Sequence, residues 1–137
     1  MSMAERAKAT QVVSGRLADW ARTFSNRDLD SLGRYYDQGR DLSVAWPDGH
    51  RTFGWREESA AERAFLAGAS QLNFAIRDVT VDVIAQTVAV ATFSASLDRA
   101  VGARRTLCIG PGTSVWVLEE GPDWRIRTLQ TACANSQ

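Results

Sequence analysis

Hydrophobic positions in the first half of the chain follow the period of a helix. Between residues 10 and 25 they form one stripe of an amphipathic helix, at Val13, Leu17, Trp20 and Phe24. Asp28 can cap a second short helix that ends before Gly39. A third helix is expected over residues 56–69, with Ala61, Phe65 and Leu66 facing inward, and residues 1–9 are expected to be flexible.

From Leu72 onward the period changes to two, which is typical of strands. Val79, Val81 and Val83 alternate in the opposite phase to the residues at 72, 74 and 76, so a β-bulge is predicted near Arg77 and Asp78. Further strands are expected over residues 88–97, 104–119 and 124–133, with a bend or a bulge at residues 110–112. A short strand over residues 42–46 precedes the turn sequence at 47–49.

Helices first and an antiparallel meander second predict an α+β fold in one domain spanning residues 1–137. Bent strands would let the strongly curved sheet wrap around the three N-terminal helices as a conical barrel. Such a cone encloses either a packed core or a pocket, and the sequence pattern alone does not separate the two.

Composition excludes several classes of function. The 137 residues carry 16 basic and 16 acidic side chains, so neither a nucleic acid nor an anionic membrane is expected as a partner. No apolar run approaches the roughly 20 residues of a membrane span, and residues 1–11 lack the apolar stretch of a signal peptide. The protein is therefore predicted to be cytoplasmic.

The sequence offers few residues for metal or redox chemistry. It has one histidine and two cysteines, Cys108 and Cys133, and we expect both cysteines to be buried thiols in a reducing compartment. No metal site and no cofactor is predicted.

Five tryptophans are the unusual feature of the composition. An inward-facing aromatic wall with a few polar groups suits a flat, apolar ligand, although the same residues could simply fill the core. In the last strand, alternation places Thr128 and Gln130 on the face of Trp124 and Ile126. The predicted pocket residues are Trp20, Tyr36, Trp46, Phe65, Trp116, Thr128 and Gln130.

Two residues are candidates for proton transfer. His50 follows the turn and is the one side chain whose ordinary pKa lies near neutrality. Asp41 opens the short strand, and a carboxylate buried there against tryptophan would have a raised pKa. The alternative for both is a solvated loop position.

The order of these elements, with motifs at their joints, resembles the nuclear transport factor 2-like superfamily, which includes SnoaL-like polyketide cyclases and ketosteroid isomerases. The motifs are Asp28-Leu29-Asp30-Ser31-Leu32, Trp46-Pro47-Asp48-Gly49 and Asp123-Trp124-Arg125-Ile126, and the similarity covers about residues 13–131. The resemblance implies a conical α+β barrel that often forms a homodimer through its sheet.

The chain departs from the superfamily at its working positions. Trp46 occupies the place of the isomerase base, and Trp20 occupies the place of the oxyanion-binding tyrosine. Thr128 and Gln130 stand where many SnoaL-like sequences have histidines. The resemblance therefore implies a protein that binds a small apolar molecule, with acid–base isomerisation, cyclisation or hydration of a cyclic or polyketide-like substrate as its chemistry. The alternative is a non-catalytic dimerisation module with a filled core.

Overall fold

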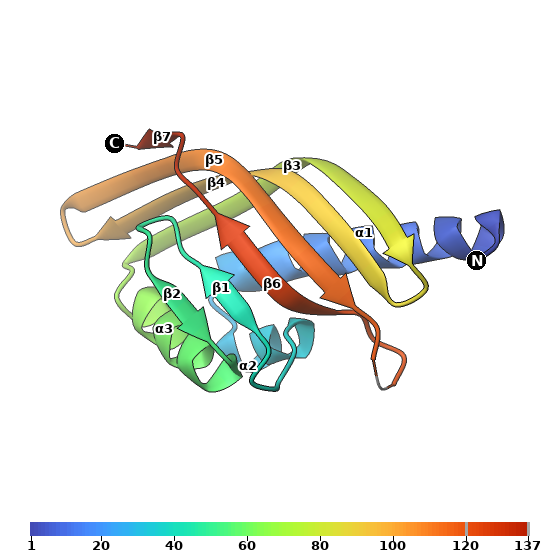
Figure 1. Ribbon diagram of the computed structural model, residues 1–137. Coiled ribbons are helices and arrows are strands. Elements are labelled where there is room, and N and C mark those ends of the chain that lie inside the picture. Colours follow the sequence, from blue (N-terminus) through green and yellow to red (C-terminus); the bar gives the residue numbers. More distant parts are fainter. Residues whose placement is uncertain (120, 137) are drawn as a thin grey trace.

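Three helices lie on one side of a curled, unclosed sheet in the computed structural model, which describes residues 1–119 and 121–136 (Figure 1). The helices are α1 (Met3–Ser25), α2 (Leu29–Leu32) and α3 (Trp55–Ala67), and a 3-10 turn, η1 (Gly33–Tyr35), follows α2. The predicted α+β class and the wrapped arrangement are confirmed.

The sheet has the strand order β2-β1-β6-β5-β4-β3. Neighbouring strands are antiparallel except β1 and β6, which are parallel. The strands are β1 (Ser43–Ala45), β2 (Arg51–Phe53), β3 (Gln71–Ala85), β4 (Val88–Val101), β5 (Arg104–Val117) and β6 (Arg125–Thr131), and a short β7 (Asn135–Ser136) pairs with β5.

Helix α1 begins at Met3, so residues 3–9 belong to the helix and not to a flexible segment. The reason is a capping box: the Ser2 hydroxyl accepts from the Glu5 backbone N–H at 3.0 Å, and the Glu5 carboxylate accepts from the Ser2 N–H at 3.1 Å. The predicted apolar stripe is buried, including Val13 and Leu17.

The predicted β-bulge is confirmed. The pairing of β3 with β4 shifts between Arg77 and Thr80, and Asp78 has a positive φ of 56°. Strand β5 continues through residues 110–112 without a register shift against β4, so no bulge interrupts it there. Gly110 and Gly112 serve close packing instead: a Cβ on Gly112 would lie 2.2 Å from the Phe93 ring.

Cys108 and Cys133 form a disulfide, with Cα atoms 5.1 Å apart, so the expectation of two free thiols is wrong. The sequence separation of 25 residues gives no sign of this pairing. The sheet brings the two residues together because the segment after β6 crosses back over β5 and pairs with it as β7. The disulfide ties the C-terminal segment to the sheet.

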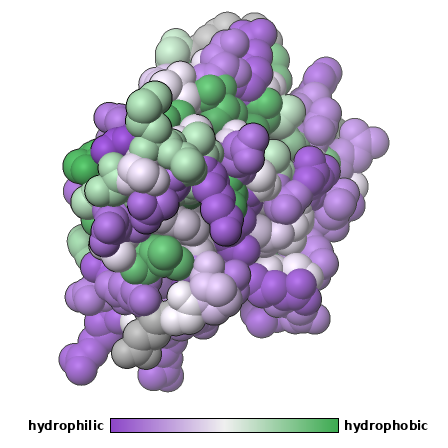
Figure 2. Space-filling view, turned by 90° about the vertical axis from the view of Figure 1, so that its right-hand side faces the viewer, coloured by the Kyte–Doolittle hydropathy of each residue, from purple (hydrophilic) through white to green (hydrophobic). Residues whose placement is uncertain are grey.

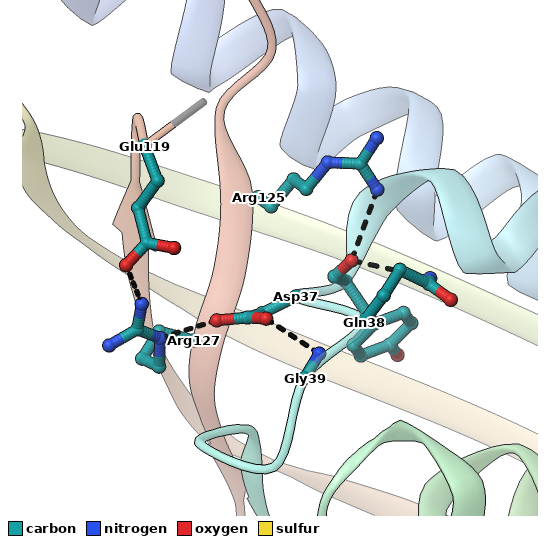
Figure 3. Close-up of polar contacts among 7 residues, drawn as sticks. Asp37, Gln38, Gly39, Glu119, Arg125 and Arg127 are labelled. Carbon is teal, nitrogen blue, oxygen red and sulfur yellow. Dashed lines mark hydrogen bonds and ion pairs between the residues drawn. The ribbon is translucent and has the colours of Figure 1, made fainter. Parts of the chain in front are cut away.

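Charged residues fix the segment after η1 to β6 (Figure 3). Arg127 binds Asp37 at 2.6 Å and also pairs with Glu119, while Arg125 donates to the backbone carbonyl of Tyr36 at 3.3 Å. The Asp37 N–H donates to the carbonyl of Ile126 at 2.9 Å. These contacts attach the backbone at Tyr36 to β6, where the Tyr36 side chain is fully buried.

The surface is of mixed character. On the face in Figure 2, hydrophilic side chains surround smaller hydrophobic areas. Phe53 and Ile84 are the most exposed large hydrophobic residues after the N-terminal Met3. Within the described residues, none of the helices has the length and apolar character needed to cross a bilayer.

Candidate functional site

A cavity of about 830 Å³ lies between the helices and the concave side of the sheet. Aromatic side chains form much of its wall: Trp20, Phe24, Tyr36, Trp46, Phe65 and Phe74. Several of them contact one another, and the rings of Trp20 and Phe74 meet edge to face with centroids 5.3 Å apart. Side chains therefore do not fill the interior, and the remaining space is large enough for a ring-sized molecule.

Two glutamates of α3 reach this apolar cavity. Glu58 and Glu62 are four residues apart, so they share one face of the helix, and their exposed fractions are 1% and 0%. One oxygen of Glu58 accepts two hydrogen bonds, from the indole N–H of Trp46 at 2.9 Å and from the hydroxyl of Thr52 at 2.7 Å. These two donors fix the position of the Glu58 carboxyl in the cavity wall.

Glu62 is in the opposite situation. Neither of its carboxyl oxygens has a hydrogen-bond partner among the described residues. Its removal from water, and then the neighbouring Glu58 carboxyl, raise the pKa of Glu62 well above its ordinary value. The pair thus combines a hydrogen-bonded carboxylate with a carboxyl that holds its proton at higher pH, a combination suited to acid–base work.

Sequence reasoning missed both glutamates, although a signal was present. Leu66 was correctly expected to face inward, and steps of four residues back from Leu66 reach Glu62 and then Glu58. Apolar residues alone defined the predicted inward face of α3. A helical stripe that contains charged residues among apolar ones is the pattern that marks this site.

Tyr36 and Trp20 line the cavity and are hydrogen-bonded to each other. The Trp20 indole N–H donates to the Tyr36 hydroxyl at 2.8 Å. Burial, followed by the charges of Glu62 and Glu58, raises the pKa of Tyr36 well above its ordinary value. The phenol therefore stays protonated, and its own O–H is left to donate toward the carboxyl pair or a ligand.

His50 also contributes to the wall of the cavity, at its exposed side. Its Nδ1 lies 2.6 Å from a carboxylate oxygen of Asp48, which also accepts from the His50 backbone N–H at 3.0 Å. These bonds lower the pKa of Asp48. The His50 ring stacks on Trp46, with centroids 5.3 Å apart. A carboxylate on Nδ1 fixes the orientation of the imidazole.

The structure brings together five of the nine residues singled out from the sequence: Trp20, Tyr36, Trp46, His50 and Phe65 all line the cavity. Asp41 does not, because it is an exposed residue of the turn before β1. Trp116 is fully buried in the core, where its indole N–H donates to the Ser114 hydroxyl at 2.9 Å. Neither of these two residues lines the cavity.

Thr128 and Gln130 lie outside the cavity because β6 contains an irregularity. Its register against β5 shifts between the pairs Val115–Thr128 and Trp116–Ile126, so the alternation changes phase at Arg127. Leu129 and Thr131 line the cavity in their place. The predicted shared face with Ile126 is therefore wrong, because strict alternation was assumed through the bulge.

No metal centre can be built from the described side chains, since no three His, Cys, Asp or Glu residues among them gather closely enough to hold an ion. The chemistry that the site offers is that of carboxyl, phenol, indole and imidazole groups in an apolar surrounding.

Comparison with solved structures shows the same fold at low sequence identity. A protein from Novosphingobium aromaticivorans provisionally assigned as a scytalone dehydratase has a TM-score of 0.88 at 9% identity, over 99% of this chain and 91% of that one. The hexachlorocyclohexane dehydrochlorinase LinA-type3 from Novosphingobium barchaimii has a TM-score of 0.84 at 9% identity, over 99% and 93%. A nuclear transport factor 2-like superfamily protein from Salmonella enterica has a TM-score of 0.83 at 16% identity, over 94% and 93%.

Identities this low show the fold alone. A search of the curated proteins finds no match. The family model described as a SnoaL-like domain, however, matches residues 13–131, nearly the whole chain. The chain therefore belongs to the SnoaL-like domain family.

Proposed function

We propose that the protein is an enzyme that binds a small, largely apolar cyclic molecule and acts on it by proton transfer, as an isomerase, a cyclase or a hydratase–dehydratase. The observation that carries the proposal is Glu62, a fully buried carboxyl without a hydrogen-bond partner among the described residues that faces an apolar cavity. Leaving such a group unpaired costs roughly 1–3 kcal/mol, which a purely structural role does not explain.

The two glutamates take different roles in this proposal. Glu62 is the general acid, because burial raises its pKa and so favours its protonated form. Glu58 is the general base, because hydrogen bonds from Trp46 and Thr52 hold its carboxyl in place at the cavity. Tyr36, which also lines the cavity, donates a hydrogen bond to the reacting group.

His50 is a second candidate for proton transfer, since it lines the cavity and Asp48 orients it. Its place at the exposed side suits exchange of protons between the cavity and water. Asp41 takes no part in the proposal, because it is exposed and lies outside the cavity.

The first test is native mass spectrometry of the purified protein, followed by the same sample denatured. A small molecule that is lost on denaturation would identify the ligand. The released compound is then incubated with the wild type, with Glu62→Gln and with the matched control Glu57→Gln, whose residue is exposed and does not line the cavity. The proposal expects turnover to fall by about 10²–10⁴-fold in Glu62→Gln alone. Full turnover by Glu62→Gln would contradict it.

Homodimer formation through the sheet remains a proposal that rests on family resemblance. The same native mass measurement tests it, because a dimer doubles the mass. The disulfide bears on the cell compartment: disulfides persist in oxidising surroundings, so we do not extend the proposal to a cytoplasmic location.

A further inference from the structure

The cavity has an uneven charge composition. Among the described residues that line it, Asp48, Glu58 and Glu62 are acidic and none is Arg or Lys. Arg99 packs on the ring of Phe65, with its Cζ 4.2 Å from the centroid, but it does not line the cavity. Neither Glu58 nor Glu62 makes an ion pair with a described residue.

The charge of Glu58 is therefore uncompensated within the described part of the chain. Its hydrogen-bond donors, Trp46 and Thr52, are neutral, and the neighbouring Tyr36 is neutral as well. The inner part of the cavity therefore carries negative charge in an apolar surrounding, with no Arg or Lys among its described lining residues. A charge in such a medium interacts strongly with an opposite one, and it disfavours a second negative charge just as strongly.

The aromatic wall of the cavity also favours a positively charged group over a negatively charged one. Ring faces carry negative potential, and a cation placed over them is stabilised, most strongly when it is removed from water. Trp46 and Phe65 lie in contact, with centroids 5.2 Å apart, and Trp46 also binds Glu58. The Glu58 carboxyl and the aromatic rings of Trp46 and Phe65 therefore form one continuous part of the cavity wall.

We propose that this site handles a reacting group that gains positive charge, so that its substrate is a cyclic alcohol, or the corresponding alkene, and not an anion or an enolate-forming ketone. This inference rests on the proposed function and names its substrate class. Glu62 lies in the cavity, and neither of its carboxyl oxygens has a partner among the described residues. The group is therefore free to form a hydrogen bond with a substrate hydroxyl.

The dehydration step balances within the pair. The Glu62 proton passes to the substrate hydroxyl, the C–O bond breaks with its electron pair leaving on water, and the ring carbon gains positive charge against the aromatic wall. The Glu58 carboxylate removes a proton from the adjacent carbon, and that C–H electron pair forms the C=C bond. Transfer of this proton from Glu58 to Glu62 restores the pair, and hydration is the reverse.

Three compounds that share the tetralin ring system test the charge preference by isothermal titration calorimetry at pH 7. They are 1-aminotetralin, a cation that mimics the charged ring carbon, 1-tetralol, which is neutral, and tetralin-1-carboxylate, an anion. We expect the amine to bind at least about tenfold more tightly than the alcohol, and the anion not to bind. Glu58→Gln should abolish the preference, whereas Glu57→Gln, at an exposed residue outside the cavity, should retain it.

The outcomes separate the inference from the proposed function. Equal affinity for amine and alcohol, or binding of the anion, overturns the inference while binding of the alcohol still supports the proposed function. Tighter binding of 1-tetralone with exchange of its α-protons for deuterium also overturns the inference, since it indicates an enolate. Binding of none of these compounds counts against both. The comparison within the wild type decides even if Glu58→Gln fails to fold.

Discussion

Trp20 of α1 and Tyr36, which follows η1, are joined by a hydrogen bond of 2.8 Å between the indole nitrogen and the phenol oxygen. Exposed fractions of 2% and 0% show that both side chains are removed from water. The bond links the long helix to the segment that β6 holds through Arg125 and Arg127. Hydrogen bonds therefore connect α1, the segment at Tyr36 and β6, and hold this part of the cavity wall together.

Replacing Tyr36 by Phe is expected to destabilise the fold by about 1–3 kcal/mol, because it leaves the buried Trp20 N–H without an acceptor. Urea unfolding of the variant measures the change. Tyr35→Phe is the control, since the hydroxyl of Tyr35 makes only a 3.5 Å contact with Thr23. Equal stability of Tyr36→Phe and the wild type would show that the bond contributes nothing.

Glu62 should make the protein less stable as pH rises. Its pKa is raised in the folded state, so the folded protein binds more protons than the unfolded chain, whose glutamate titrates at about 4.3. The contribution of Glu62 is fully present below that pH and is lost as pH rises toward the folded pKa, by up to about 1.4 kcal/mol per pH unit.

Thermal melts of the wild type and Glu62→Gln between pH 5 and pH 8 test this expectation. The melting temperature of the wild type should fall more steeply than that of the variant. The lowered pKa values of Asp48 and Asp98 act with the opposite sign but below about pH 4, outside this range. Parallel curves would contradict the assignment of a raised pKa to Glu62.

The disulfide between Cys108 and Cys133 should contribute about 3 kcal/mol to stability, since it closes a loop of 25 residues in the unfolded chain. Reduction with a phosphine should lower the melting temperature of the wild type and leave Cys133→Ser unchanged. Alkylation of both cysteines in the native protein without a reductant would show that the bond is absent.

Much of the fold could be predicted because its signals are local. The stripe through Val13 and Leu17 and the phase change near Asp78 each reflect a single element, whose period follows from its own backbone geometry. The limits of α1 were harder, because they depend on the side-chain cap at Ser2. The pairing of Cys108 with Cys133 depends on how distant segments cross, which no local pattern encodes.

The site divides in the same way. Trp20, Trp46 and His50 were found because aromatic and imidazole groups stand out in the sequence. Glu58 and Glu62 were missed because charged residues are usually solvated, and their burial follows from the packing of α3 across the cavity. Gln130 was predicted on the wrong face of β6, because the bulge near Arg127 adds one residue to the strand. One extra residue moves the side chains that follow to the opposite face of the sheet.

Gly110 allows the C-terminal segment to cross β5 at close range. A Cβ at this position would lie 2.1 Å from the carbonyl oxygen of Ala132 and 2.7 Å from the nitrogen of Ala134, both of which are backbone atoms. Gly110→Ala must therefore displace the segment that carries Cys133, and we expect it to lower stability by about 1–3 kcal/mol.

Gly15→Ala is the matched control for this substitution. Gly15 lies on the exposed side of α1, and a methyl group added there would have no neighbouring atom within 4 Å. Alanine at this position should therefore raise stability by roughly 0.5–1 kcal/mol through helix propensity. Denaturant unfolding of both variants, with free thiols counted in Gly110→Ala, checks the pair. If Gly110→Ala were as stable as the wild type with the disulfide formed, the close crossing would not be a constraint on this chain.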